Sequence, residues 1–159
     1  MNIDTVRSLR REGKHEEACN LALRLLATDP GNAELQLEAA SIHDFLGQEA
    51  AAVPFYLNAM AGELGDSQRL GAYVGLGSTY RTLGRYEDAE KVLLEGRARF
   101  PTAKEIWVFL AMTQHNLGKT KEAFELLLGL LAETSNDDGI REYRRAIALY
   151  AQDIAKTYR

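Results

Sequence analysis

A glycine recurs along the chain at a nearly constant interval, and this repeat constrains the fold more than any other feature of the sequence. Gly13, Gly47, Gly84 and Gly118 are separated by 34, 37 and 34 residues, and an alanine stands five positions after each of them. A period of this length is typical of an array of small units, in which each unit buries its apolar face against its neighbours. The sequence therefore predicts four stacked units.

Each repeat glycine separates two segments in which apolar residues have helical spacing. In the third unit, Leu76 lies in the segment before Gly84 and Leu93 in the segment after it. Glycine suits the turn because it can adopt the left-handed backbone conformation that ends a helix. The unit closes at Pro101, where a helix must stop. Each unit is therefore predicted to be a helix, a tight turn and an antiparallel helix.

The third unit carries a nearly complete known repeat pattern, formed by Tyr73, Leu76, Gly77, Tyr80, Ala89, Leu93, Gly96 and Pro101. This pattern resembles the tetratricopeptide repeat (TPR), and the resemblance extends over about residues 1–135. The chain as a whole is similar to a bacterial family of short, stand-alone TPR proteins that have no assigned activity and are thought to act through protein contacts as dimers. The resemblance implies an all-α, right-handed α-solenoid in a single domain, with repeats at about 1–32, 33–69, 70–103 and 104–135.

The three extra residues between the second and third glycines fall within 61–69, where two glycines and two polar residues predict a longer loop. Beyond the fourth unit, apolar residues spaced by three and four predict one more helix over about 138–158, of about five turns. This helix would cap the exposed flank of the fourth hairpin. Alternatively, its Tyr143, Ile147 and Tyr150 would form a homodimer interface.

The charge balance and the cysteine count narrow the classes of partner and compartment. The chain has 19 basic and 23 acidic residues, so its net charge of -4 gives no electrostatic reason to bind nucleic acid or an anionic membrane. Its single cysteine, Cys19, excludes an internal disulfide. The first residues lack a leader pattern, and no apolar stretch is long enough to span a bilayer. We therefore expect a cytoplasmic protein.

Residues that could carry chemistry are sparse and do not form a motif. The three histidines all lie at positions that the repeat explains, and His15 and Cys19 alone would make a poor metal site. Paired acids such as Glu16 and Glu17 lie at helix starts, where a carboxylate favours the helix dipole. The sequence predicts no enzyme activity, no metal and no cofactor.

The TPR resemblance implies that the first helix of each unit lines a concave groove, in which a protein or peptide partner would bind. The matching positions are Arg7, Arg10, Arg11, Leu37, Ser41, Asp44, Phe45, Val74, Ser78, Arg81, Thr82, Val108, Met112, His115 and Asn116. Arginines donate paired hydrogen bonds to carboxylates in fork geometry, so the mixture favours a peptide or helix with apolar anchors and acidic flanks. The alternative is an empty groove or one filled by the last helix.

One known mode of TPR binding is not expected for this chain. Chaperone-binding TPR domains hold a C-terminal carboxylate with lysines and asparagines on successive first helices. The matching positions here are Ile3, Arg7, Glu38, Ser41, Gly71 and Gly75. The clamp is therefore absent from the sequence.

Overall fold

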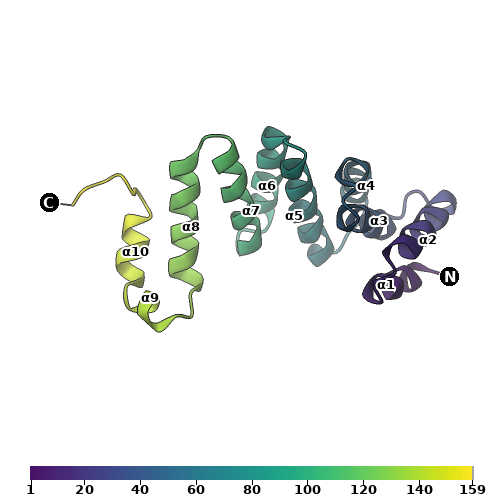
Figure 1. The fold of residues 1–159 in the computed structure, drawn as a ribbon, viewed down its shortest axis with the longest axis horizontal. Helices are drawn as coiled ribbons and strands as arrows, with labels where there is room; N and C mark the ends of the chain where they lie inside the picture. The colour runs from purple at the N-terminus through teal and green to yellow at the C-terminus, as the bar shows by residue number, and fades with distance from the viewer. Residues whose placement is uncertain (159) are drawn as a thin grey trace.

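The computed structural model describes residues 1–158, and over this range it contains ten helices and no strand (Figure 1). Eight of the helices form four hairpins in a row, which begins at the N-terminus and leaves the C-terminus at the opposite end. The helices are α1 (Ile3–Arg11), α2 (His15–Thr28), α3 (Ala33–Phe45), α4 (Glu49–Ala61), α5 (Asp66–Thr82), α6 (Tyr86–Arg99), α7 (Lys104–Asn116), α8 (Thr120–Thr134), α9 (Asp138–Glu142) and α10 (Arg144–Tyr150). The predicted all-helical solenoid is confirmed.

All four hairpins turn at the repeat glycine with the same geometry. The repeat glycines have φ between 71° and 79°, a conformation in which any other residue would be strained. The amide after each glycine donates to the carbonyl five residues before it, as from Lys14 to Leu9 (2.9 Å) and from Arg85 to Tyr80 (2.8 Å). This is the hydrogen bond of the Schellman motif, which satisfies the last carbonyls of the first helix. The predicted glycine turns are present at all four positions.

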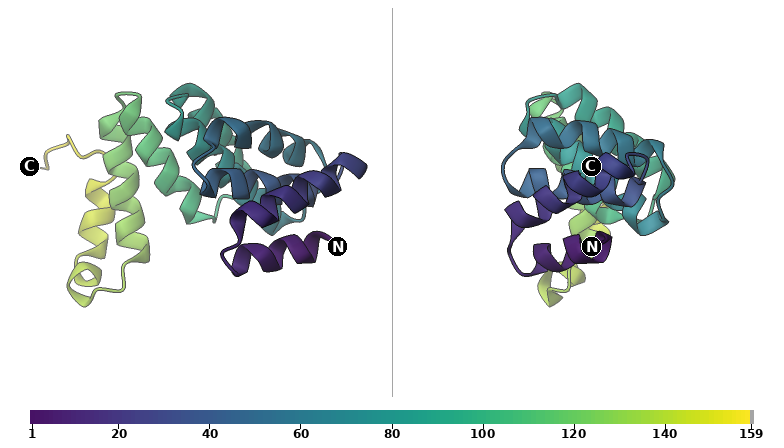
Figure 2. Two further views of the ribbon diagram at one scale, coloured as in Figure 1. Left: turned by 45° about the vertical axis from the view of Figure 1, so that its right-hand side comes forward. Right: turned by 90° about the vertical axis from the view of Figure 1, so that its right-hand side faces the viewer.

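The hairpins stack so that each first helix contacts both helices of the hairpin before it. Consecutive first helices, α1 with α3, α3 with α5 and α5 with α7, contact one another, whereas the second helices make no contacts of that extent. The row therefore curves, with α1, α3, α5 and α7 on its concave side, as the two further views in Figure 2 help to follow. The core forms three successive clusters around Ile42, Leu76 and Leu110, all of which are almost fully buried.

The inserted segment is more ordered than the sequence predicts. Only residues 62–65 separate α4 from α5, and 66–69 form the first turn of α5 rather than part of a loop. The side-chain Oε1 of Gln68 accepts a hydrogen bond from the Gly65 amide (3.1 Å), which caps the helix start. Arg69 donates to the carbonyls of Met60 (3.0 Å) and Gly62 (2.8 Å). Its guanidinium therefore caps the C-terminal end of α4, where no proline follows the helix as Pro101 follows α6.

The single long helix predicted over 138–158 is wrong. The structure has two short helices, α9 and α10, which are separated at Tyr143, and the chain is not helical after Tyr150. The Tyr143 amide bonds the Ile140 carbonyl three residues back (3.1 Å), which tightens the chain at the break. Beyond α10, Asp153 pairs with Lys121 of α8 (2.9 Å) and accepts from the Ala155 amide (3.2 Å), so local polar contacts replace further helical turns. The expected capping contact remains, because α10 packs along α8.

Close approach of the helices in the third hairpin predicts opposite effects for two glycines of α5. A Cβ at Gly77 would lie 2.5 Å from Leu93 Cδ2. A Cβ at Gly71 would have no atom within 4 Å. We expect Gly77→Ala to lower the free energy of unfolding by about 1–3 kcal/mol through overpacking. We expect Gly71→Ala to raise it by about 0.5–1 kcal/mol through helix propensity. Urea unfolding followed by circular dichroism measures both, and equal effects would contradict this packing.

The concave surface as a candidate functional site

At the N-terminal end of the concave surface, two arginines are engaged within the chain. Arg7 donates to Glu34 Oε2 (2.8 Å) and to Glu38 Oε1 (2.9 Å), and Arg10 also pairs with Glu38. These hydrogen bonds, first that to Glu38 and then that to Glu34, raise the pKa of Arg7. Two of the arginines that were predicted to bind a partner's carboxylate are therefore engaged within the chain. They join α1 to α3 and so fix the contact between the first and second hairpins. We call the contact between two successive hairpins a joint, and this one is the first joint.

Beside these ion pairs lies a pocket of about 570 Å³, lined by Asp4, Arg7, Arg10, Arg11, His15 and Phe45. Phe45 is 68% exposed, and its ring stacks on the His15 ring with a centroid separation of 3.8 Å. Arg11 donates to Ser8 Oγ (3.3 Å) and has no acidic partner among residues 1–158. The pocket therefore offers a ligand the guanidinium of Arg11 and the exposed face of the Phe45 ring. The sequence analysis did not include His15 in the groove, because it considered only first helices and His15 begins α2, a second helix.

In the middle of the surface, the predicted polar residues are used for packing. Asp44 Oδ2 accepts hydrogen bonds from the Tyr56 hydroxyl (2.7 Å) and from Thr79 Oγ1 (2.7 Å), so it connects the second unit to the third. Burial, together with the bond to Asp44, raises the pKa of Tyr56. Ser78 and Thr82 bond backbone carbonyls of their own helix, and Ser41 is half-buried. Of these residues, only Thr82 is exposed.

The apolar strip expected along the groove becomes more exposed toward the C-terminus. Leu37 and Val74 are half-buried and pack against neighbouring core clusters, whereas Val108 is 40% exposed. Met112, one turn further along α7, is half-buried. Leu37, Val74 and Val108 therefore occupy equivalent positions in successive first helices, but only Val108 is exposed.

Polar groups lie at the C-terminal ends of α5 and α7. Arg81 Nε donates to Asn116 Oδ1 (2.8 Å), so this arginine is held across α5 and α7 without a carboxylate partner in the described chain. His115 is exposed and lies 3.4 Å from Thr120 Oγ1 through its Nδ1. Arg81 therefore keeps a charge without a carboxylate partner among the described residues.

The predicted dimer residues lie at the C-terminal end of the row. Tyr143 and Tyr150 are exposed, and Ile147 is half-buried on the same short helical segment. The Tyr150 ring contacts the Tyr158 ring, with centroids 5.6 Å apart. Much of the aromatic surface of this segment is therefore available to another molecule.

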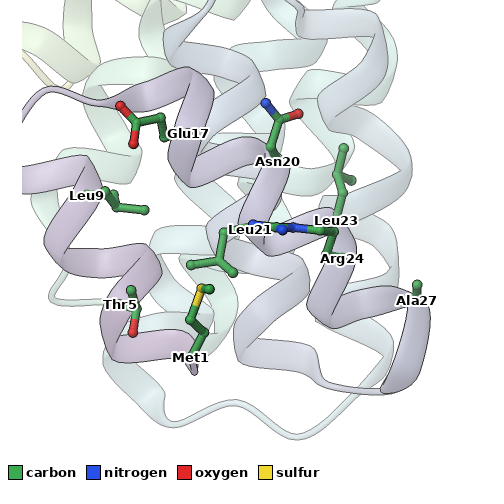
Figure 3. Close-up of a pocket in the computed structure, with 9 residues that line it drawn as sticks. All are labelled: Met1, Thr5, Leu9, Glu17, Asn20, Leu21, Leu23, Arg24 and Ala27. Atoms are coloured by element: carbon green, nitrogen blue, oxygen red, sulfur yellow. The ribbon is translucent and has the colours of Figure 1, made fainter.

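A pocket of about 940 Å³ lies outside the groove, at the outer face of the first hairpin (Figure 3). Leu9 of α1 and Leu21 of α2 point into the space between the two helices, and Met1 lies beside them. Glu17 and Asn20 of α2 add polar groups to its lining. This face corresponds to the place where, at the inner joints, the second helix of a preceding unit lies.

The single cysteine of the chain, Cys19, is buried in the core between the first and second hairpins. Cys19 Sγ lies 3.7 Å from His43 Nε2, and His43 Nδ1 lies 2.7 Å from Gln48 Oε1. Burial raises the pKa of the Cys19 thiol, which favours the neutral form over the reactive thiolate. The arrangement is therefore that of a hydrogen-bonded core thiol. Over residues 1–158, no three His, Cys, Asp or Glu side chains are grouped to hold a metal ion, and none of the helices has the length and apolar character to cross a bilayer.

A curved row of helical hairpins, with a concave face of mixed polarity, defines a helical-repeat protein of the kind that serves as a protein–protein interaction scaffold. The chain belongs to the tetratricopeptide repeat family, because the family's sequence model, described as "Tetratrico peptide repeat", matches residues 33–154. The match includes α9 and α10, which the sequence pattern had placed outside the repeats.

Solved structures agree on the fold. The crystal structure of MamA superposes with a TM-score of 0.71 at 19% identity, over 96% of this chain and 94% of that chain. The TPR-like repeats of a Podosopora anserina protein described as a kinesin light chain superpose with a TM-score of 0.67 at 20% identity, over 95% of this chain and 88% of that chain. No curated protein matches the sequence. At these identities the likeness concerns the fold alone.

The ion pairs of the first joint predict an acid-dependent stability. Hydrogen bonds from Arg7 and then from Gln68 lower the pKa of Glu34. A lowered carboxyl pKa stabilises the fold above its unfolded value of about 4.3, and that contribution disappears as the pH falls through the folded pKa. Because Glu34 is partly exposed and screened by solvent, we expect Glu34→Gln to cost at most about 1 kcal/mol at pH 7.

Urea unfolding of the wild type and of Glu34→Gln between pH 3 and pH 7 measures this contribution. The difference between the two proteins should shrink toward zero at the acidic end of the range. Glu95→Gln, on the exposed side of α6, is the matched control for loss of one carboxylate. A difference that grows on acidification would contradict the assigned pairing.

Proposed function

We propose that this chain is a non-catalytic scaffold that binds an acidic peptide or helix along its concave surface. The observation that supports this most directly is the pocket beside Phe45, in which an exposed aromatic ring and Arg11 lie next to each other. An aromatic platform beside a guanidinium suits a segment with an apolar anchor and a neighbouring carboxylate. The buried, unpaired Cys19 is compatible with a cytoplasmic setting.

Three features of the surface define the expected ligand. Phe45 provides an apolar anchor point at the N-terminal end of the groove, and Val108 provides one at the C-terminal end. Arg11 and Arg81 lie on the same side without carboxylate partners among the described residues. A bound segment would therefore place apolar side chains at both ends and acidic side chains near the arginines. Arg7 and Arg10 would position the first two hairpins rather than contact the ligand.

Selection from a random peptide library displayed on phage, with the immobilised full chain as bait, tests the proposal. We expect the selected peptides to be enriched in acidic residues beside apolar anchors. Their affinity, measured by fluorescence anisotropy, should fall about tenfold or more for Arg11→Glu and for Arg81→Glu. Lys91→Glu on the outer helix α6 makes the same change in net charge and should bind normally. Equal binding by all variants would remove the arginines from the site.

A second candidate function is self-association through the C-terminal segment. The exposed Tyr143 and Tyr150 support it, because tyrosine is enriched at protein interfaces, where a ring can be buried while its hydroxyl stays wet. In such a homodimer the tyrosine face of one protomer would pack on the same face of its partner.

Molar mass by size-exclusion chromatography with light scattering, over a range of concentrations, decides between the two states. If the homodimer exists, the wild type should have a mass near twice 17.7 kDa, and Tyr143→Asp with Tyr150→Asp should shift it to the monomer mass. Tyr86→Asp at the start of α6 is a matched control outside the segment. A wild type that stays monomeric at all concentrations would contradict the homodimer and leave the groove proposal standing.

A further inference from the structure

The outer face of the first hairpin is open, although the same face is covered in the other three hairpins. At each joint, the second helix of the preceding hairpin packs on the first helix of the next. The positions twelve and eight residues before the repeat glycine of that first helix are buried, and they are Leu35 and Ala39, Ala72 and Leu76, and Ile106 and Leu110. In α1 the same two positions are Met1, which is 86% exposed, and Thr5, which is half-buried.

Residues of both helices line the pocket of about 940 Å³ at this open face (Figure 3). We use the name N-terminal end face for six of them, which are Met1, Thr5 and Leu9 of α1 and Glu17, Leu21 and Arg24 of α2. Their spacing of three and four residues places each set on one side of its helix. Leu21 is buried and Leu9 is half-buried, whereas Glu17 and Arg24 are exposed. The face therefore combines apolar side chains with two accessible charges.

The two helices of the N-terminal end face have a common centre. Thr5 stands eight residues before Gly13, and Leu21 stands eight residues after it. Because the turn at Gly13 joins two antiparallel helices with the same rise per residue, Thr5 and Leu21 lie side by side, and both line the same pocket. Along α1, Met1 and Leu9 stand four residues on either side of this centre. The apolar side chains of α1 are therefore arranged symmetrically about Thr5.

The two charges of the N-terminal end face are placed about the same centre and have opposite signs. Glu17 precedes Leu21 by four residues and Arg24 follows it by three, so the charges lie two helical turns apart on one side of α2. Neither forms an ion pair with another residue among 1–158. Each is therefore available to a charge of opposite sign on another molecule.

This arrangement makes the N-terminal end face complementary to itself. A half-turn about an axis that runs across both helices at their common centre reverses the direction of each helix. It therefore packs α1 antiparallel on the partner's α1, and α2 antiparallel on the partner's α2. Glu17 then lies opposite the partner's Arg24, and Met1 lies opposite the partner's Leu9. Each contact occurs twice, as an isologous interface requires. A head-to-tail contact with the last hairpin of another copy would not use this match of charges.

We propose that the N-terminal end face binds the same face of a second copy of this chain, with Glu17 of each protomer paired with the partner's Arg24. The second copy covers α1 and α2 in place of the preceding hairpin that covers each later one. This surface lies at the opposite end of the row from Tyr143 and Tyr150, and none of its six residues is among the groove positions. The inference is therefore independent of both candidate functions given above.

Exchange of the two charges tests the pairing, with molar mass measured by light scattering on the full chain over a range of concentrations. The wild type should approach twice 17.7 kDa. Glu17→Arg and Arg24→Glu each place like charges opposite each other at two points of the interface. Each should raise the dissociation constant of the dimer about tenfold or more. The double variant, Glu17→Arg with Arg24→Glu, restores opposite charges and should dimerise like the wild type.

A disulfide at the axis is a second, independent measurement. Thr5 lies on the proposed axis, so it faces the partner's Thr5 closely enough for Thr5→Cys to form a disulfide between two copies when oxidised by ferricyanide. Non-reducing electrophoresis should show the linked dimer. Thr82→Cys, which is exposed on α5, is the matched control and should stay unlinked.

Two controls separate this interface from other contacts between copies. Glu95→Arg makes the same charge change as Glu17→Arg but lies on the exposed side of α6, and it should dimerise like the wild type. So should Tyr143→Asp with Tyr150→Asp, which removes contacts through the C-terminal segment. Circular dichroism checks that each variant is folded.

The proposal is overturned if the wild type stays monomeric, if the single charge variants dimerise as well as the wild type, or if the double exchange does not restore the dimer. It is also overturned if the double tyrosine variant is a monomer, because the contact then lies at the C-terminal end. A mass that keeps rising beyond the dimer in that variant would indicate head-to-tail stacking instead.

Discussion

The structure depends on the contact between the second helix of one hairpin and the first helix of the next. An isolated hairpin buries only the face between its own two helices, so the remaining apolar faces must be covered by a neighbour. The almost fully buried Ile42, Leu76 and Ile106 all belong to first helices that pack on the preceding unit. The three core clusters follow one another along the row, and the molecule has no single centre on which all of its residues converge.

The side chains that make this contact differ from one joint to the next. Arg7 and Arg10 reach across the first joint to acidic residues of α3. At the second joint Asp44 receives hydroxyl donors from Tyr56 and Thr79, and Gly75 makes room for the tyrosine ring. At the third joint, apolar side chains of α5, α6 and α7 form one cluster. The backbone repeats, but the chemistry that joins successive units does not.

The sequence predicts the parts of the fold that one residue or one local pattern determines. Gly84 and its equivalents mark every turn, because the left-handed conformation at that point excludes other residues. The pairing of Arg7 with Glu34 and Glu38 was missed, since it joins residues about thirty positions apart and requires the packing of α1 on α3. The terminal segment was predicted too long because its apolar spacing continues past Tyr150, whereas polar contacts of Asp153 end the helix. Phe124, Leu127 and Leu131 of α8 have the same apolar spacing as residues buried in the first two second helices, and only the structure shows that these three are exposed.

The ion pairs and the apolar contacts between hairpins respond differently to the salt concentration. Charge attraction between partly exposed groups is screened over about 8 Å at physiological ionic strength and over shorter distances in more concentrated salt. Apolar packing is not weakened in this way, and salts that are excluded from protein surfaces strengthen it. Arg7 and Arg10 therefore add a salt-sensitive attraction to the apolar packing that already joins the first hairpin to the second. The charged part of the contact between α1 and α3 is therefore expected to weaken as the salt concentration rises, and so is the pairing of Lys119 with Glu90 between the third and fourth hairpins.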